Sequence, residues 1–282
     1  MTMKFNYIKA FLPLLSLMML YACDKIEEPY ARDTTPGVSK GRKVLLEEYT
    51  GHKCPNCPEA SLLAHEIAHD YPEVILISIH AGNFAVPNPS GLFSSDFRTT
   101  VGDELNAYFK VGAYPSATVN RSGFQGNVTL ASSVWEQAVA SFQDFDPVAR
   151  LQLSGTYDTL SRQLDVTVKT DVIENILSPL QLVVYLTEDS IIRAQNNNNP
   201  EVGPTPYITN YVHRHVLRAS FNGTFGATLT TGPVGFGTSI SRNFSMVLDT
   251  AWNAGNCSYV AFIADQTTQE VLQAEQARVI LP

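Results

Sequence analysis

The chain has 282 residues, 44% of them hydrophobic, and a formal net charge of −8 at pH 7. This acidic balance gives no electrostatic basis for binding nucleic acid, so we expect no nucleic-acid partner. The composition agrees with a secreted, soluble body, and the length without an N-terminal signal suits two domains better than one.

The first 22 residues have the pattern of a secretory signal. Lys4 and Lys9 precede an apolar stretch at positions 10–20, which is too short to span a bilayer comfortably. The stretch ends in Leu-Tyr-Ala before Cys23, and this ending is similar to a bacterial lipobox, in which the cysteine is lipidated and becomes the first mature residue. We therefore expect a signal peptide at 1–22 and lipidation, including palmitate, on Cys23. The alternative is an ordinary cleaved signal followed by an unmodified cysteine.

Residues 23–40 are predicted to be a tether between the lipid anchor and the folded body. Pro29, Pro36 and Gly37 in this stretch favour an extended linker over a helix. The acidic residues directly after Cys23 resemble the surface-export signal of Bacteroidota lipoproteins, which indicates a position at the cell surface.

The sequence Cys-Pro-Asn-Cys at 54–57 lies between an apolar, strand-like run and a helical pattern. Two cysteines with this spacing can close a disulfide, and a helix N-terminus stabilises the first of them as a thiolate. The same spacing could be half of a zinc site. The only other cysteines are Cys23 and Cys257, so no second pair completes such a site. The pattern therefore favours a redox or structural disulfide over a metal.

Residues 41–145 have an element order that resembles a thioredoxin-like domain. Strand, cysteine motif, helix and strand in succession predict a parallel strand pair with a right-handed crossover. Apolar residues recur at every third and fourth position of the first helix, which predicts that this face packs on the sheet. The elements expected here are strands at 43–49, 73–80 and 116–119 and helices at 58–71, 97–109 and 130–143.

Tyr114 and Pro115 precede the last of these strands and resemble the cis-proline loop of thioredoxins. In that fold the proline packs beside the disulfide, and the backbone of the preceding residue pairs with substrate. The resemblance implies that Pro115 belongs to the catalytic centre and that Tyr114 contacts substrate, together with Pro55 and Asn56. The alternative is a trans proline at a strand start, where its missing N–H does least harm.

The resemblance also implies a catalytic acid at Glu48. Thioredoxins have a buried acidic residue six positions before the first motif cysteine, and Glu48 stands there in this chain. Strand alternation places Glu48 on one face with Val44 and Leu46, and an apolar face raises the pKa of a carboxyl group. Near neutral pH it could then move a proton to or from Cys57. Glu47 would point the other way, and a solvated pair of glutamates is the alternative.

This chain departs from thioredoxins directly before the motif. Thioredoxins have a tryptophan there, whereas this chain has His52 and Lys53, so an aromatic substrate surface is missing. Both residues are predicted to contact substrate and to favour a Cys54 thiolate. We expect Cys54 to be more exposed than Cys57, with a pKa below the usual ~8.5, and Cys57 to keep the higher value.

His65, Glu66 and His69 spell the H-E-x-x-H pattern of zinc proteases. Two histidines one helical turn apart can share a metal, with the glutamate as general base. These three residues fall opposite the apolar stripe of the helix at 58–71, so we expect them to face solvent. No further histidine continues the motif. The context therefore disfavours a protease, and we expect no metal.

Residues 146–282 change to a period of two, which indicates strands. Seven or so short strands separated by Gly, Asn, Ser and Pro predict an immunoglobulin-like β-sandwich. The alternating segments are 149–155, 163–169, 182–186, 213–217, 241–248 and 259–263.

Three features of this half are open to more than one interpretation. The Asn-rich segment 196–210 is predicted to be a long solvated loop that either binds something or is disordered. His213 and His215 would share one strand face and could bind a metal, but a structural role is favoured. Cys257 lies in an apolar strand and is expected to be a buried, inert thiol rather than a resolving cysteine.

Together these motifs resemble the twenty-eight-kilodalton outer-membrane protein family of Bacteroidota. The resemblance depends on the lipobox, the stretch from Tyr49 to Pro58, the Tyr-Pro-Ser at 114–116 and the strand motif at 213–218. It covers nearly the whole mature chain. It implies an outer-membrane, lipid-anchored protein with a thioredoxin-like domain, and it says less about substrate.

Two functions from different classes follow. In the first, the protein exchanges disulfides with protein thiols of the cell envelope: Cys54 attacks, Cys57 resolves, Glu48 moves a proton and Pro115 with Tyr114 positions the partner. No cofactor is needed. In the second, the protein is a surface binding protein or adhesin whose sandwich contacts a host or surface ligand, and the disulfide is structural. Exposure of Cys54 distinguishes them, because a catalytic thiol has to be reached.

Overall fold

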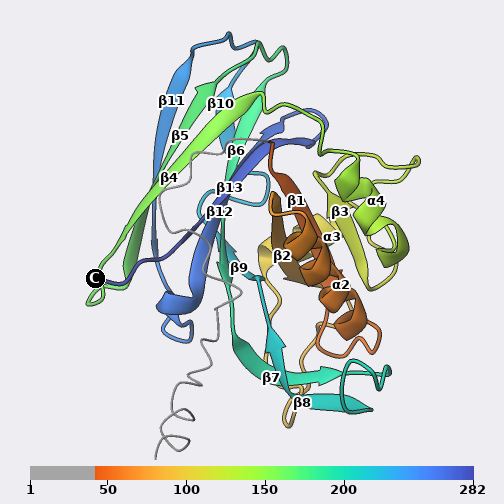
Figure 1. Cartoon of the computed structure of the whole chain (residues 1–282). Coiled ribbons are helices and arrows are strands. Elements are labelled where there is room, and N and C mark those ends of the chain that lie inside the picture. The colour runs from red at the N-terminus through yellow and green to blue at the C-terminus, as the bar shows by residue number, and fades with distance from the viewer. Residues whose placement is uncertain (1–41) are drawn as a thin grey trace, which may run out of the picture. The chain divides into compact units, whose positions relative to one another are not determined.

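The computed structural model describes residues 42–282, and its N-terminal part is organised around three strands. β1 (Val44–Thr50), α2 (Cys57–Asp70) and β2 (Val74–His80) follow one another along the chain. β1 and β2 are parallel and in register over their whole length, and β3 (Ser116–Val119) pairs antiparallel with the other edge of β1. The predicted strand–helix–strand order and the parallel pair are confirmed (Figure 1).

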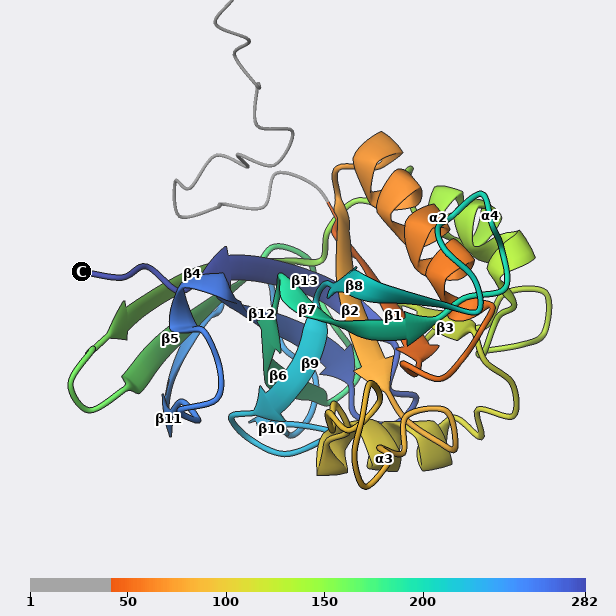
Figure 2. The same cartoon turned by 90° about the horizontal axis from the view of Figure 1, so that it is seen from below.

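Helices cover both faces of these three strands (Figure 2). α2 and α4 (Trp135–Ala140), which follows the short helix η1 (Ser132–Val134), pack on one face in a cluster with alternate residues of β1 and β2. α3 (Thr100–Tyr108) lies on the opposite face, where Leu105 is buried. It begins later than predicted because Thr99 is its N-cap and accepts a hydrogen bond from the Gly102 N–H.

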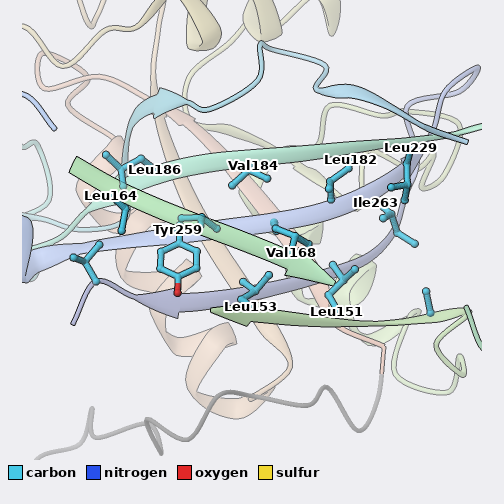
Figure 3. Packing of buried hydrophobic residues seen from close by; sticks show 14 of the residues in the cluster. Leu151, Leu153, Leu164, Val168, Leu182, Val184, Leu186, Leu229, Tyr259 and Ile263 are labelled. Carbon is cyan, nitrogen blue, oxygen red and sulfur yellow. The ribbon is translucent and has the colours of Figure 1, made fainter. Parts of the chain in front are cut away.

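The C-terminal part contains a smaller, three-stranded antiparallel sheet in the order β11-β5-β4. Its inward side chains pack against β6 and β12 of the larger sheet, and this forms the largest apolar cluster (Figure 3). Two layers of sheet around an apolar core match the predicted sandwich. The strands are β4 (Ala149–Tyr157), β5 (Gln163–Val172), β6 (Leu180–Glu188), β7 (Ile191–Asn196), β8 (Tyr207–His213), β9 (Val216–Ser220), β10 (Ala227–Thr230), β11 (Ser239–Val247), β12 (Cys257–Asp265) and β13 (Val271–Arg278), with the short helix η2 (Ala254–Asn256) before β12.

The larger sheet crosses the predicted domain boundary at 145/146. Its strands run in the order β13-β12-β6-β9-β2-β1-β3, so strands from both halves of the sequence form one sheet. The junction is the pairing of Ser78 in β2 with Val216 in β9, supported by the Ser78 N–H donating to the His215 carbonyl at 2.8 Å. The prediction of two domains, 41–145 and 146–282, with separate sheets is wrong. Periodicity identifies a strand but not the edge to which it adds.

A buried ion pair of the first half also contacts the second half. The carboxylate of Glu47 receives two hydrogen bonds from Arg121, at 2.6 and 2.8 Å, and one from Thr118 at 2.9 Å. Arg121 also donates to the hydroxyl of Tyr185 in β6 at 3.2 Å. Glu47 points away from Glu48, as predicted, but it is fully buried. The alternative of a solvated glutamate pair is therefore wrong.

The predicted signal peptide at 1–22, the tether at 23–40 and the lipidated Cys23 lie outside the described residues. Within residues 42–282, every helix is too short or too polar to cross a membrane.

Candidate functional site

Cys54 and Cys57 form a disulfide at the start of α2, with 5.4 Å between their Cα atoms. Cys57 is the first residue of the helix and Cys54 lies in the loop before it. Both residues are only 1% exposed. The prediction that Cys54 is the more exposed of the two is wrong, because other segments of the chain pack over the motif.

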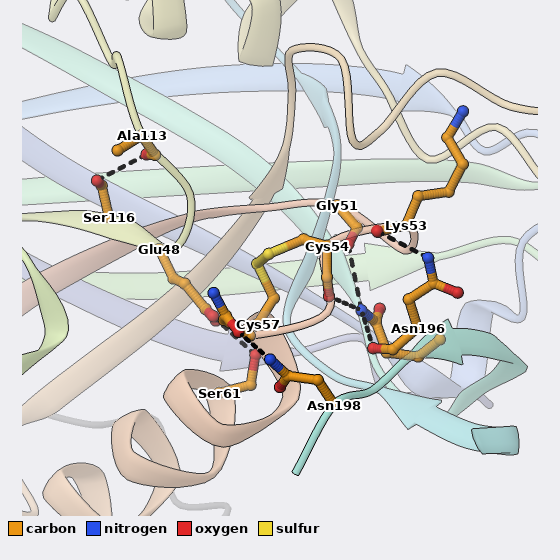
Figure 4. Close-up of a disulfide and its surroundings, with 12 residues drawn as sticks. Glu48, Gly51, Lys53, Cys54, Cys57, Ser61, Ala113, Ser116, Asn196 and Asn198 are labelled. Atoms are coloured by element: carbon orange, nitrogen blue, oxygen red, sulfur yellow. Dashed lines mark hydrogen bonds between the residues drawn. A yellow bond between two sulfur atoms is a disulfide. The ribbon is translucent and has the colours of Figure 1, made fainter. Parts of the chain in front are cut away.

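A four-residue strap, residues 195–198 at the end of β7, binds the motif from the second half of the chain (Figure 4). Its donors reach the carbonyl oxygens of five successive residues, 51 to 55, and the side chain of Asn56. The hydrogen bonds are Gln195 Nε2 to Gly51 O (3.2 Å) and Cys54 O (2.9 Å), Asn196 N to His52 O (2.8 Å), Asn196 Nδ2 to Lys53 O (2.9 Å), Asn198 N to Pro55 O (3.1 Å) and Asn198 Nδ2 to Asn56 Oδ1 (2.6 Å). The strap therefore holds the backbone of the motif in place.

The strap corrects the expectation of a solvated loop at 196–210 only for the first residues of that segment. Gln195 and Asn197 are buried, and β8 begins at Tyr207. The side chain of Asn197 donates to the carbonyls of Asn199 and Gly203 at 2.8 and 2.9 Å, so it stabilises the turn from within. The asparagines bond to groups of the loop and of the motif, while Asn198 and most of residues 200–210 are exposed, as predicted.

The carboxyl group of Glu48 lies beside the first turn of α2. It accepts hydrogen bonds from Ser61 at 2.7 Å and from Ser78 at 3.3 Å. Ser61 is four residues after Cys57, so both occupy the same face of the helix. Glu48 is 3% exposed, and burial raises its pKa from the usual 4.5 to about 7, while the two hydroxyls lower it slightly. The predicted face and raised pKa are both confirmed.

Replacing Glu48 with glutamine should change the pH dependence of stability. A carboxyl group with a pKa of about 7 in the folded protein and 4.5 in the unfolded chain binds more protons when folded. Its contribution to the free energy of unfolding is then present below pH 4.5 and is lost as the pH rises to 7. We therefore expect the free energy of unfolding of Glu48→Gln, relative to that of the wild type, to increase by about 3 kcal/mol as the pH rises from acidic to mildly alkaline.

Urea unfolding of both proteins at several pH values measures this gap. The comparison cancels the titration of other buried groups, because both proteins share them. A gap that is constant from acid to alkali would contradict a raised pKa for Glu48.

His52 and Lys53 differ from each other in their surroundings. His52 is buried, and its ring stacks on Phe93 with 5.7 Å between ring centroids. Burial, and then the charge of Lys53, lower the pKa of His52. The imidazole is therefore neutral near pH 7, and the expectation that its charge favours a Cys54 thiolate is wrong. Lys53 is half-buried, and its ammonium group donates to Asn88 at 3.4 Å.

The predicted substrate loop contains a cis peptide bond between Tyr114 and Pro115, as expected. The Tyr114 hydroxyl donates to Asn106, and its ring packs edge-on against Phe84, 6.1 Å away. Phe84 also approaches the motif: a Cβ on Gly51 would lie 2.5 Å from the Phe84 carbonyl carbon. Only glycine therefore fits at position 51, where the loop after β2 meets the loop before α2.

The H-E-x-x-H residues do not form a shared site. Glu66 and His69 are exposed, as predicted, and His69 contacts Asp70 at 2.9 Å. His65 is half-buried rather than exposed as expected, because the turn after β8 places His215 5.6 Å from its ring. Burial, and then His215, lower the pKa of His65 to about 4.

His213 and His215 do not share a strand face, which corrects the second metal hypothesis. β8 ends at His213, and His215 has a φ of +52° in the connection to β9. His213 is buried against Phe97 and His80, at centroid distances of 4.8 and 5.4 Å. Among residues 42–282, no group of three or more His, Cys, Asp or Glu side chains is arranged to hold a metal. Cys257 is buried, as expected, and burial raises the pKa of its thiol to about 12.

Sequence reasoning missed the partners of the motif and of Glu48. Ser61 could have been found, because it lies one helical turn after Cys57 on the face that meets β1. Ser78 could have been found from the register of β1 and β2, in which it is opposite Glu48. Gln195, Asn196 and Asn198 had no local signal, since they reach the motif across more than 140 residues of sequence.

Comparisons with known proteins agree with this architecture. A family model described as "Outer membrane protein Omp28" matches residues 102–280, more than half of the chain. Among solved structures, HBP35 of Porphyromonas gingivalis has a TM-score of 0.63 at 17% identity, over 86% of this chain and 77% of that one. A domain of the outer membrane lipoprotein Omp28 from Porphyromonas gingivalis has a TM-score of 0.31 at 22% identity, over 46% of this chain and 93% of that one. The comparison with curated proteins gave no match. The likeness to HBP35 shows a mixed α/β fold made mostly of sheet.

Proposed function

Because this chain belongs to the Omp28 family of outer-membrane proteins, we propose that it acts in the cell envelope as a thiol–disulfide oxidoreductase. Its redox centre is the Cys54–Cys57 pair at the N-terminus of α2. The partners are protein thiols or disulfides of the envelope. A lipid on Cys23, which lies outside the described residues, would hold the protein at the outer membrane.

The observation that carries this proposal is the environment of Glu48. Glu48 is buried with two hydroxyl partners and, among the described residues, has no ion-pair partner, so its charged form lowers stability. A purely structural disulfide does not need such a group beside it. A redox pair does, because each half-reaction moves a proton to or from a thiol. With a pKa of about 7, Glu48 can accept or donate that proton near neutral pH.

The proposed exchange takes place in two steps. In the reduced protein the Cys54 thiolate attacks a partner disulfide, and one partner sulfur leaves as a thiolate. Glu48 then removes the proton of the Cys57 thiol, and the Cys57 sulfur attacks Cys54. The mixed disulfide breaks, the second partner thiolate leaves, and the Cys54–Cys57 disulfide forms. Two electrons have passed to the partner, and the same steps in reverse oxidise a partner dithiol.

The fold supports a finer assignment of the two halves. We assign β1, α2, β2, α3, β3 and α4 as a thioredoxin-like unit, because a parallel pair, an antiparallel third strand and helices on both faces surround the motif. We assign the two-layered part as immunoglobulin-like. The loop at Tyr114 and Pro115, and the motif residues Pro55 and Asn56, remain the predicted partner contacts.

A second function is favoured by one observation. Both motif sulfurs belong to residues that are 1% exposed, beneath hydrogen bonds from the strap. A disulfide that stays covered is structural, and the protein would then be a surface binding protein that contacts its ligand through the sandwich. The two functions differ in whether the disulfide ever reacts.

The test is exchange between the purified full-length protein and a model disulfide or dithiol, together with the reduction potential of the Cys54–Cys57 couple. We expect measurable turnover that Cys54→Ser abolishes and that Cys57→Ser converts into trapped mixed disulfides. Cys257→Ser is the matched control and should exchange normally, because its thiol is buried far along the sequence in β12. A protein that exchanges in neither direction, and whose disulfide resists strong reductants, supports the binding function instead.

A further inference from the structure

β11 forms the outer edge of the smaller sheet, and within residues 42–282 no strand pairs with its open side (Figure 1). It pairs with β5 over nine residues in continuous register, without a bulge. It contains no proline, and its one charged residue is Arg242. Proteins protect an exposed edge with short strands, prolines, bulges or several charges, because the unpaired backbone is a template for another strand. β11 is long, regular and nearly uncharged, so its edge can accept a strand.

Two other edge strands are protected in the usual ways. β3 and β10 have four residues each. The outer side of β3 is covered, because Ala117 exchanges two backbone hydrogen bonds with Leu130, at 2.8 and 2.9 Å. The pairing of β10 with β6 is irregular between Thr228 and Thr230. The open edge of β11 therefore differs from these edges in both length and regularity.

The backbone hydrogen bonds at the two ends of β11 show which residues face the open side. Before the strand, the Val172 N–H donates to the Thr238 carbonyl at 2.8 Å, and after it the Leu248 N–H donates to the Arg162 carbonyl at 2.9 Å. Antiparallel strands alternate, so the even-numbered residues between 238 and 248 bond to β5. The odd-numbered residues direct their N–H and C=O groups to the open side. These residues are Ser239, Ser241, Asn243, Ser245 and Val247.

The side chains of β11 suit a further strand on both faces. Ile240, Phe244 and Met246 are half-buried against the apolar cluster between the two sheets, so part of each side chain stays in contact with water. A strand added at the edge would cover that surface. On the outer face, Asn243 accepts a hydrogen bond from the hydroxyl group of Thr167 in β5 at 2.9 Å. Its side-chain NH₂ group has no acceptor among the described residues and is left to donate across the edge.

We propose that β11 pairs antiparallel with β11 of a second copy of this chain, about a two-fold axis beside Asn243. Position 243 is the middle of the strand, so this register pairs all nine residues of each copy. It places the outward residues opposite one another, and the two edges then exchange about ten backbone hydrogen bonds. A two-fold arrangement is closed, so it gives a dimer and not a fibre.

The charge on the strand favours this register over its neighbours. With the axis at position 243, Arg242 lies opposite Phe244 of the partner subunit, and a guanidinium beside an aromatic ring is favourable. Ile240 lies opposite Met246 of the partner subunit, so two apolar side chains meet. Moving the axis by one residue to position 242 would place two arginines opposite each other, which is destabilising. β11 is therefore complementary to itself in the register that uses its whole length.

In the single chain, Arg242 covers part of the open edge. Its guanidinium donates to the carbonyl oxygen of Ser241 at 3.1 Å. Ser241 is one of the outward residues, and in the dimer this oxygen would accept from the N–H of Ser245 of the partner subunit. The Arg242 side chain is exposed, so it is free to turn toward the aromatic ring of the second copy when that N–H replaces it.

A cysteine at the axis tests the register in the full-length protein. Asn243→Cys should form a disulfide between two copies under mild oxidation, seen on a non-reducing gel. The two Cα atoms of such a pair are about 5.5 Å apart, which is within disulfide range. Val247→Cys is the matched control, an exposed position on the same edge that would lie about 27 Å from its copy. It should not bridge alone, but it should bridge when mixed with Ser239→Cys, its partner in this register.

A proline at the axis tests the interface without disturbing the sheet. The N–H of residue 243 faces the open side, so Asn243→Pro removes no hydrogen bond to β5. Two symmetry-related bonds between the copies are lost, and we expect the dissociation constant of the dimer to rise about 100-fold. Sedimentation equilibrium of the full-length protein in density-matched detergent measures it. Asn243→Thr keeps the N–H and should dimerise like the wild type.

Should Asn243→Pro fail to fold, Asn243→Lys replaces it, because it places two like charges opposite each other and should also weaken the dimer. A wild type that stays monomeric at its highest soluble concentration overturns the proposal and leaves the edge to solvent or to a strand of another protein. A dimer that is equally stable in Asn243→Pro, or that Val247→Cys alone bridges as readily as Asn243→Cys, overturns the pairing as well. Neither measurement depends on thiol exchange by Cys54, so the dimer stands or falls independently of the redox function.

Discussion

Replacing Arg121 with methionine is expected to lower the free energy of unfolding by about 3–5 kcal/mol. The change removes the guanidinium that donates two hydrogen bonds to Glu47 and one to Tyr185. The carboxylate of Glu47 then stays fully buried with Thr118 as its remaining donor. Breaking one side of a buried pair leaves an uncompensated charge, and that penalty is larger than the net contribution of the intact pair. Urea unfolding of the full chain at neutral pH measures the loss.

Arg98 provides the matched control. Like Arg121, it forms a bidentate ion pair, in this case with Asp96 at 2.9 and 2.8 Å. This pair lies at the surface. Arg98→Met should cost no more than about 1 kcal/mol, since exposed pairs are solvated and screened. The double variant Glu47→Leu with Arg121→Met should regain most of the lost stability, because both charges are then absent. An Arg121→Met protein as stable as Arg98→Met would contradict the expected penalty for leaving the buried Glu47 carboxylate without its partner.

Local patterns were sufficient to predict the elements around the motif. The apolar spacing of Ala60, Ala64 and Ile67 placed α2 on the sheet, and these residues are buried. Alternation in β1 placed Glu48 on the face with Val44 and Leu46, which is the face that α2 covers. Both predictions depend on residues within about four positions of one another, where the period of a helix or strand decides which side chains meet.

Long-range contacts could not be predicted in this way. The sequence of β13, Val-Leu-Gln-Ala-Glu-Gln-Ala-Arg, has a weak intrinsic preference for a strand, and it is a strand because it pairs with β12. β9 adds to β2 through one pair of residues that are 138 positions apart, Ser78 and Val216. Because of this pairing, strands of the two predicted domains form one continuous sheet. The burial of Cys54 has the same kind of origin, since Gln195 reaches it from the other half of the chain.

Removing the side chains of the strap is expected to speed up reduction of the Cys54–Cys57 disulfide about 100-fold. The variant Gln195→Ala with Asn196→Ala and Asn198→Ala loses four hydrogen bonds to residues 51–56. At about 0.5–1.5 kcal/mol each, these four bonds stabilise the closed strap by about 3 kcal/mol. Because each 1.4 kcal/mol is about a factor of ten, their loss should increase the population with the strap detached from the motif about 100-fold. The carbonyls of Gly51 and Cys54 keep their backbone partners, the N–H groups of Cys54 and Cys57, so the motif itself should hold its shape.

The measurement is the rate at which a small dithiol reduces the disulfide in the native protein, followed by labelling of the thiols that are released. Asn199→Ala is the control in the same loop, because its side chain bonds to the Glu201 N–H and not to the motif. Global stability, measured by urea unfolding, shows whether faster reduction comes from local opening or from general unfolding. If the triple variant is reduced at the rate of the wild type, the strap does not control access. If it is reduced quickly but exchanges with no protein disulfide or dithiol, access is not what limits the chemistry, and the disulfide of this outer-membrane protein is structural.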